Sequence, residues 1–404
     1  MQISIIQPSR NNLKYLKWSY DAIRRNQGDH TVEICVADDF SDKDGTWDWC
    51  LDMMEKDPLF KAIRNEGPTR LGHTILYDRL VNEVASFDVC IIYHADMYLC
   101  PGALNQIEKH IGPKKIVSLT RIEPPLHPPG PEKILLDCGI EPEQFDEDKL
   151  LHYLEMEYDI LYEGKITEGI FAPWAFMKSD FQEIGGHDPL YAPQSKEDSD
   201  IFNRFQLNGV KFIQTWEGFV YHMTCRGSRF NPELTTPGKN SPEWEAQNLR
   251  STRNFIRKWG HFCKHDTLMN PIVPSKYNVA FRVENCNQSL LEILEPWCDR
   301  IYSDADWMKY ITLEQSKTTY DLTKRCHTIT DTDRYDYDDI IVEINGQRFT
   351  NQDFAYIQQL SEILDASDLL NEFSQPGEQF ELGNLKITIM SVQTYEKNLI
   401  KIKQ

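Results

Sequence analysis

The chain has 404 residues, which is enough for two or three domains with a sizeable core in each. Hydrophobic residues make up 40% and charged residues 26%, which is the composition of a folded globular protein. The formal net charge of −20 argues against broad binding to nucleic acid or anionic lipid, because both would repel an acidic surface.

The ten cysteines lie far apart without a C-x-x-C pair, so we expect free thiols in a reducing compartment. Residues 1–8 hold a short apolar stretch without the basic region or cleavage site of a signal peptide. No apolar run approaches the roughly 20 residues that span a bilayer. We therefore expect a soluble, cytoplasmic protein without a transmembrane segment, and any membrane contact would be peripheral.

The first 120 residues alternate short apolar runs with longer amphipathic ones, which is the pattern of βαβ units. The expected strands lie near residues 2–7, 31–38, 88–94 and 115–120. The expected helices lie near residues 12–26, 46–56, 73–86 and 101–111. The sequence thus predicts an α/β fold that begins with a doubly wound, mostly parallel, Rossmann-like sheet.

Prolines then interrupt this rhythm over residues 121–150, which predicts an irregular crossing loop. Regular structure is expected again in the run 169–177, in a helix near 195–208 and in a strand near 210–216. A linker-like segment follows at about residue 270, and strand-like runs lie beyond it at 278–284, 339–344 and 385–392. We therefore expect one domain over residues 1–265 and a smaller α+β domain over 270–404.

Asp38 and Asp39 follow the second expected strand. This position is the carboxyl edge of the sheet, where open α/β folds bind ligands. A carboxylate there can accept hydrogen bonds from a base imide or from ribose hydroxyls. The alternative is a turn rich in Asp and Gly that caps the next helix.

Asp96 is delivered to the same edge by the apolar run 89–93. Magnesium and manganese prefer oxygen ligands, and a carboxylate at a strand end can hold such an ion against a diphosphate. An acidic protein that handles an anionic nucleotide also needs a local cation. The alternative is an ordinary aspartate after a buried strand.

Acidic residues gather at an expected helix start in Glu197-Asp198-Ser199-Asp200. A carboxylate there could deprotonate an acceptor hydroxyl, and the alternative is plain helix capping. His222 follows a strand that contains Trp216 and could complete a metal shell. A lone histidine is more often a packed or surface residue, so its meaning depends on its neighbours.

Taken in order, these motifs resemble the family 2 glycosyltransferases, which have the GT-A fold. The family pattern combines a proline in the first strand, an Asp-Asp-x-Ser turn, a D-x-D-type motif, Gly-Gly-Phe-Asp, Glu-Asp-x-Asp with a following Arg, and a late His. The matching residues are Pro8, Asp38-Asp39-Phe40-Ser41, His94-Ala95-Asp96, Gly185-Gly186-His187-Asp188, Glu197-Asp198-Ser199-Asp200 with Arg204, and His222. The resemblance covers about residues 1–230 and leaves the C-terminal domain unassigned.

The resemblance implies a metal-dependent, inverting, hexosyltransferase-like enzyme of polysaccharide or glycan biosynthesis. It would use Mn²⁺ or Mg²⁺ as its cofactor. The donor would be a nucleotide sugar, with a UDP-sugar expected first, and the acceptor would be a glycan or another molecule with a hydroxyl group. The implied general base is Asp198, and the implied metal ligands are Asp96 and His222. The implied donor-nucleotide residues are Pro8, Asp38, Asp39, Arg70, Ala95 and Asp96. The implied acceptor and sugar side comprises Gly185, Gly186, Glu197 and Trp216.

Two positions depart from the family pattern. His94 replaces the first aspartate of the D-x-D motif and leaves Asp96 as the main carboxylate ligand, and His187 replaces the usual aromatic. One alternative is a carbohydrate-binding or assembly protein with reduced catalysis on the same fold. A sugar-phosphate nucleotidyltransferase would be expected to have a Gly-rich loop after the first strand, and residues 7–12 contain no glycine.

The C-terminal domain contains aromatic residues that could stack on sugar rings, although such residues more often form a core. They include Trp297, Tyr302, Trp307 and Tyr335. Acceptor recognition and homo-oligomerisation are both open roles for this domain.

Overall fold

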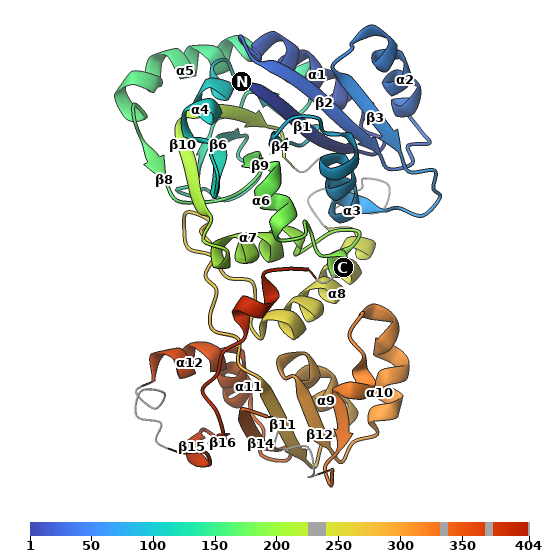
Figure 1. Ribbon diagram of the computed structural model, residues 1–404, viewed down its shortest axis with the longest axis vertical. Coiled ribbons are helices and arrows are strands. Elements are labelled where there is room, and N and C mark those ends of the chain that lie inside the picture. Colours follow the sequence, from blue (N-terminus) through green and yellow to red (C-terminus); the bar gives the residue numbers. More distant parts are fainter. Residues whose placement is uncertain (225–239, 332–337, 368–374, 403–404) are drawn as a thin grey trace. The chain divides into compact units, whose positions relative to one another are not determined.

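The computed structural model describes residues 1–224, 240–331, 338–367 and 375–402, without the side chains of 157–161. The chain divides into two compact units. Unit 1 comprises Met1–Ala246, His265–Ile272 and the last residues from Lys401, and unit 2 comprises Gln247–Lys264 and Val273–Ile400. Each unit has its own sheet (Figure 1). The domain boundary expected between residues 265 and 270 stays a prediction.

The described strands of unit 1 form one mixed sheet of ten strands. Its main path runs β3-β2-β1-β4-β9-β6-β10-β5, with β7 beside β6 and β8 beside β10. The strands are β1 (Gln2–Ser9), β2 (Thr31–Asp38), β3 (Phe60–Arg64), β4 (Val89–Ile92), β5 (Met97–Leu99), β6 (Lys115–Glu123), β7 (Lys133–Leu135), β8 (Ile166–Thr167), β9 (Trp174–Met177) and β10 (Lys211–His222).

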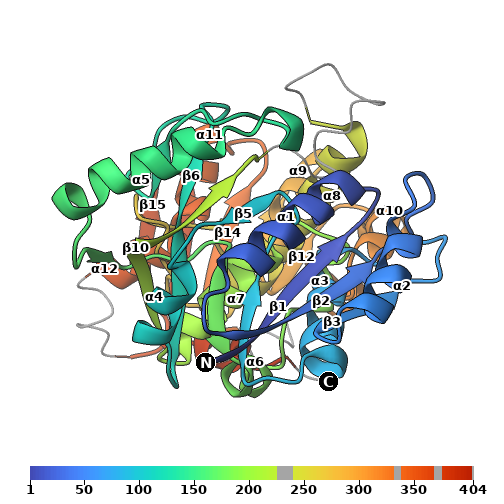
Figure 2. The same cartoon turned by 90° about the horizontal axis from the view of Figure 1, so that it is seen from above.

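Strands β1 to β4 are parallel neighbours joined by helical crossovers. The near-continuous apolar runs of β1, β2 and β4 are buried, as expected for strands covered on both faces, whereas the edge strand β3 is only partly buried. The helices of unit 1 are α1 (Leu13–Asn26), α2 (Thr46–Lys56), α3 (Gly72–Arg79), α4 (Ala103–His110), α5 (Glu147–Leu161), α6 (Lys178–Glu183) and α7 (Glu197–Leu207). Helix α1 lies beside β5, and α4 packs on β6 and β10 (Figure 2). The predicted α/β class is therefore confirmed.

The proline-rich stretch is more regular than its composition predicts. Strand β6 runs as far as Glu123, immediately before two prolines, and β7 pairs in parallel with its end. Helix α5 then begins at Glu147. The irregular crossing loop is thus confined to shorter connections, because backbone pairing at the sheet edge continues on both sides of the prolines.

Unit 2 is built on a sheet of six strands in the order β13-β12-β11-β14-β16-β15. The first four of these run parallel, and β16 and β15 are antiparallel additions. The strands are β11 (Val279–Glu284), β12 (Arg300–Ser303), β13 (Cys326–Thr328), β14 (Ile340–Asn345), β15 (Glu378–Leu382) and β16 (Leu385–Ile389). The helices are α8 (Pro242–Trp259, which belongs to this unit from Gln247), α9 (Gln288–Leu294), α10 (Trp307–Glu314), α11 (Asn351–Gln358) and α12 (Leu360–Ala366).

The expected smaller domain is thus present, and helices join β11 to β12 and β12 to β13 as in βαβ units. Trp297 and Tyr302 are buried in it, which fits the core alternative, whereas Trp307 is partly buried. Tyr335 lies outside the described residues.

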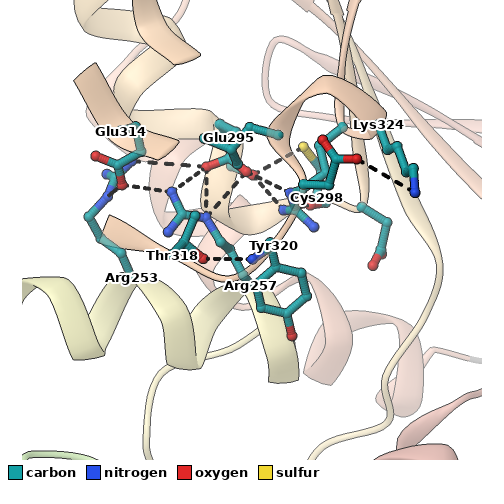
Figure 3. A network of polar contacts seen from close by, with 12 residues as sticks. Arg253, Arg257, Glu295, Cys298, Glu314, Thr318, Tyr320 and Lys324 are labelled. Atoms are coloured by element: carbon teal, nitrogen blue, oxygen red, sulfur yellow. Dashed lines mark hydrogen bonds and ion pairs between the residues drawn. The ribbon is translucent and has the colours of Figure 1, made fainter. Parts of the chain in front are cut away.

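A buried network of ion pairs ties α8 to the rest of unit 2 (Figure 3). Both oxygens of Glu295 accept hydrogen bonds, from Arg257 at 2.7 Å and from Arg325 at 2.6 Å. Arg257 also donates to Glu314 at 2.7 Å, and Glu314 accepts a second bond from Arg253. Burial opposes the ionisation of Glu295, yet the two guanidinium groups hold its pKa down at about 2. Each carboxylate of the network therefore has cationic partners within the chain.

No helix among the described residues is both long and apolar enough to cross a membrane. The cysteines in the described ranges are free thiols, and most of them are buried.

Candidate functional site

Three side chains of unit 1 converge at one edge of its sheet: His94, Asp96 and His222. One potential ligand atom from each lies within 4.8 Å of the other two. The Nε2 atom of His222 is 3.5 Å from Oδ1 of Asp96, and the ring centroids of His94 and His222 are 5.7 Å apart. This spacing suits a single divalent cation between them.

Strand pairing explains why these residues meet. His94 and Asp96 lie in the turn between β4 and β5, and β5 pairs antiparallel with the end of β10, where His222 lies opposite Met97. The backbone N–H of Met223 donates to the Asp96 carbonyl at 3.0 Å, and Gln7 donates to the His94 carbonyl. The ligand backbone is therefore held by the sheet itself.

Glu123 orients His222 from the neighbouring strand end. Its Oε1 lies 3.0 Å from Nδ1 of His222, and the carboxylate is buried between Arg121 and Lys133. An Nδ1–H that donates to a carboxylate leaves Nε2 of the same ring free for a metal ion. Such a carboxylate behind a histidine is the usual support of a metal-ligating imidazole.

The electrostatics of the cluster favour a cation. Burial disfavours the charged imidazolium of His222, but Asp96 and Glu123 outweigh it and raise the pKa of His222 to about 9. A divalent ion would be attracted by the same two carboxylates and would displace that proton. Burial lowers the pKa of His94 to about 4, so its ring is neutral near pH 7 and carries a lone pair for coordination.

Helix α3 connects this cluster with the start of α7. The His73 ring stacks near His94, with 6.4 Å between centroids. Burial raises the pKa of Tyr77, and the charges of Asp198, Glu197 and Asp96 raise it further. The candidate metal ligand Asp96 and the expected base Asp198 are therefore both close enough to act on one phenol.

The N-terminus of α3 also packs tightly on the segment that leads into α7. A Cβ on Gly72, where φ is +75°, would lie 2.0 Å from the Pro193 carbonyl oxygen, so only glycine fits there. Arg70 donates to Gln194 at 2.8 Å across the same junction. These contacts fix the first turn of α7 relative to the sheet edge.

Asp198 and Glu197 lie in that first turn with different environments. Asp198 is exposed to solvent but has enough protein around it for desolvation to raise its pKa. Glu197 is buried, and burial together with the charge of Asp198 raises its pKa to about 8. Two adjacent carboxyl groups with raised pKa values are typical of acid–base sites and less typical of helix caps.

The expected nucleotide residues occupy the ends of β1 and β2. Asp39 accepts hydrogen bonds from Asn65 and from the backbone N–H groups of Leu71 and Gly72 at 2.7 to 2.9 Å. Asp38 is fully buried and lies 3.2 Å from Arg64. Pro8, also buried, pairs with the residue that precedes Asp38. Arg70 is partly exposed and lies 3.6 Å from Asp39.

Gly185 and Gly186 serve contacts within the chain. A Cβ on Gly186 would lie 2.1 Å from the Asp78 carboxylate, and one on Gly185 would meet Ile402. Arg204 donates to the Gly186 carbonyl at 2.6 Å. The close approaches in this turn are thus made by the chain itself, and no sugar is needed to explain the glycines.

His187 also finds a structural explanation. Its Nδ1 lies 2.7 Å from Asp78, and its ring stacks on Tyr77 at 5.6 Å. A histidine here combines an aromatic face with a polar partner for Asp78. The same residue lowers the pKa of Asp198 and opposes the effect of burial.

Of two further residues expected at the site, Ala95 lies at the cluster and Trp216 does not. Ala95 is buried between the two candidate ligands of the β4–β5 turn. Trp216 lies six residues before His222 on β10, on the order of 20 Å away along an extended strand. Its indole donates to Thr167 at 2.8 Å and stacks on Tyr162, so Trp216 is part of the core and is not brought to the cluster.

Glu123, His73 and Tyr77 lie outside the sequence motifs. The only available signal for Glu123 was its position directly before a proline, where a strand commonly ends. His94 was noted only as a departure from the family pattern, although it completes the ligand set.

Residues 4–184 match the model of the glycosyl transferase family 2. The family resemblance is therefore confirmed over this segment, which contains His94 and Asp96 and ends before Asp198 and His222. No family model covers the C-terminal domain.

Two solved structures are similar over part of the chain, each at 16% identity and a TM-score of 0.40. One is GalNAc-T7 with UDP, GalNAc and Mn²⁺, with 55% of this chain and 44% of that chain covered. The other is the mannosyltransferase PcManGT from Pyrobaculum calidifontis in complex with GDP-Man and Mn²⁺, with 63% of each chain covered. The chain thus spans less than two thirds of either protein. Among curated proteins there is no match.

Proposed function

We propose that this protein transfers a sugar from a nucleotide-sugar donor to a hydroxyl acceptor with the help of a divalent cation. The observation that carries the proposal is the convergence of His94, Asp96 and His222 at the carboxyl edge of the sheet. When bound there, the ion would neutralise the charge that develops on the leaving diphosphate. The family match over residues 4–184 supports the same class of reaction.

The ligand set favours Mn²⁺ over Mg²⁺. Two imidazoles and one carboxylate offer fewer oxygen donors than Mg²⁺ prefers, whereas Mn²⁺ accepts mixed nitrogen and oxygen ligands. Glu123 would hold His222 in the orientation that presents Nε2 to the ion. We expect Mg²⁺ to support the reaction poorly.

Asp198 is the proposed general base, which removes the proton from the acceptor hydroxyl and leads to inversion at the anomeric carbon. Its exposure and raised pKa support this role, because an accessible carboxylate with a raised pKa is a stronger base for the acceptor proton. Glu197 would stand on the acceptor side. Asp39 and Arg70 would contact the donor nucleotide, for which a UDP-sugar is the first expectation, and buried Asp38 would hold their loop.

The test is release of nucleoside diphosphate from a panel of UDP- and GDP-sugars, with Mn²⁺, Mg²⁺ or chelator. We expect one donor to turn over with Mn²⁺, and Asp198→Ala to reduce kcat by about 100- to 10,000-fold with donor binding retained. Asp148→Ala is the matched control, since Asp148 is also an exposed aspartate in a helical first turn. Donor binding without turnover by the wild-type protein would instead identify a binding protein.

A further inference from the structure

Unit 2 has a cavity of about 480 Å³ at the carboxyl edge of its own sheet. Its lining residues come from the ends of three adjacent parallel strands, β11, β12 and β13, and from the turns after them. They are Arg282, Glu284, Asn285, Asp304, Ile329 and Thr330. The size is that of a small-ligand site, and this edge is where open α/β sheets bind ligands.

The cavity is unsuited to a phosphate. In nucleotide-binding α/β domains, backbone N–H groups after the first strand hold the anion. Here the N–H groups of Asn285 and Cys286 donate to the Asp304 carboxylate at 2.8 and 2.7 Å. The lining also has two carboxylates against one guanidinium, so a nucleotide would meet both an occupied anion site and a net negative charge.

The polar groups that remain suit a neutral ligand with several hydroxyls. The Arg282 side chain is 34% exposed, so its terminal guanidinium N–H groups can reach a ligand in the cavity, although Nε itself is buried. The Arg282 guanidinium lies 3.8 Å from the Glu284 carboxylate, too far for a hydrogen bond. Two neighbouring hydroxyl groups of a sugar can accept a hydrogen bond from the Arg282 guanidinium and donate one to the Glu284 carboxylate at the same time. Ile329 offers apolar contact for the face of a sugar ring.

The turn that forms one side of the cavity is held in place. The N–H of Gly346 donates to the Glu284 carbonyl at 2.8 Å, and a Cβ on Gly346 would lie 2.3 Å from the Asn285 carbonyl oxygen. The loops after β11 and β14 are therefore in close contact. A site whose backbone is fixed before binding loses less entropy when a ligand enters.

We propose that this cavity binds a neutral saccharide unit. The cavity is formed by unit 2 alone. The proposal goes beyond the proposed transfer reaction without depending on it. Such a site would allow unit 2 to hold a glycan independently of donor turnover.

The test is a titration of the full-length protein, with isoleucine methyl groups labelled, with lactose, cellobiose or mannobiose. The Ile329 methyl signal is assigned by its loss in Ile329→Val. We expect a saturable shift of this signal with at least one disaccharide and none with UDP or inorganic phosphate. Arg282→Gln should weaken the affinity at least tenfold, and Glu284→Ala, at an exposed side chain, should weaken it without affecting folding.

Lys324→Gln serves as the control, since Lys324 pairs with Asp321 before the start of β13, at the opposite edge of the sheet from the cavity. The absence of a shift with all three disaccharides, a shift with phosphate or UDP, or unchanged affinity in both Arg282→Gln and Glu284→Ala would each overturn the proposal. Nucleoside diphosphate release should stay at the wild-type level in these variants. A failure of the transfer reaction would leave the titration result intact, so the two proposals fail separately.

Discussion

Each unit buries a cluster of charged side chains, and the two clusters differ in how completely the chain satisfies them. In unit 2, the Glu295 carboxylate is bonded by Arg257, Arg325 and Tyr310 and has no need of a ligand (Figure 3). In unit 1, the charged or titratable partners of Asp96 among the described residues are the rings of His222 and His94, and burial lowers the pKa of the latter. Buried charge alone therefore does not mark a functional site. The distinguishing feature is coordinating capacity that the chain itself leaves unused.

The largest expected effect is on catalysis at the proposed metal cluster. His222→Ala removes one proposed ligand, and we expect turnover with saturating Mn²⁺ to fall by about 1,000-fold or more, since the charge on the leaving group would no longer be stabilised. His30→Ala is a matched control, because His30 is equally buried but bonds to the N-terminus and Asn105. Equal losses in the two variants would mean that the cluster has no special role.

The next effect is on stability in unit 2. Glu295→Ala leaves two buried guanidinium groups without their shared carboxylate, and we expect the free energy of unfolding to fall by about 3 to 5 kcal/mol. Glu343→Ala, which breaks a half-exposed pair with Lys386, should cost about 1 kcal/mol or less. Urea unfolding followed by circular dichroism measures both. Turnover of folded Glu295→Ala should match the wild type, and similar stability losses in the two variants would remove the contrast between the clusters.

Much of the fold was predictable from apolar periodicity. Strands β1, β2 and β4 and helices α1 and α2 lie where short buried runs and amphipathic runs alternate. Asp96 was accessible to the same reasoning, because the end of a buried strand is visible in one sequence. The role of Glu123 could not be predicted in this way. Glu123 reaches His222 because β6 lies beside β10, and no local sequence pattern shows that these two strands pair.

For the two glycines of the candidate site, the motif was visible in the sequence but the contacts were not. Gly185 and Gly186 fit the family motif, yet their contacts are with Ile402 and Asp78, which lie far away in sequence. Likewise, Trp216 is close to His222 in sequence but is separated from it by half of a long strand. A motif therefore predicts which residues share an edge more reliably than it predicts what each one contacts.

A smaller effect concerns the residue behind His222. Glu123→Gln keeps an acceptor for Nδ1–H but removes the charge, and we expect Mn²⁺ affinity to fall by about 10- to 100-fold. Titration calorimetry measures the change. Glu217→Gln, on the strand β10 that carries His222, removes the charge from a residue that pairs with Lys109, and this variant should bind Mn²⁺ as the wild type does. An unchanged Mn²⁺ affinity in Glu123→Gln would mean that the charge of Glu123 does not support metal binding by His222.

The smallest effect is a difference in pH dependence between Glu197 and Glu295. The folded pKa of Glu197, about 8, lies above its unfolded value near 4.5, so its contribution to stability declines as pH rises between these values. Glu295, with a folded pKa of about 2, contributes above 4.5 and loses that contribution as pH falls toward 2. We expect Glu197→Gln to gain Tm relative to wild type between pH 5 and pH 8.

The control for this comparison is Glu183→Gln, at a surface pair with Lys114. Its Tm should follow that of the wild type over the same pH range. A Glu197→Gln variant that loses Tm relative to wild type as pH rises would contradict the raised pKa of Glu197.

The central claim is that His94, Asp96 and His222 bind one Mn²⁺ ion. Electron spin echo envelope modulation of the Mn²⁺-loaded protein tests it directly, because coordinated imidazole nitrogen couples to the electron spin. We expect nitrogen coupling from two histidines in the wild type, from one in His94→Ala, and no stoichiometric Mn²⁺ binding in Asp96→Asn. A bound ion that shows no nitrogen coupling, or coupling unchanged in both His94→Ala and His222→Ala, would contradict the account.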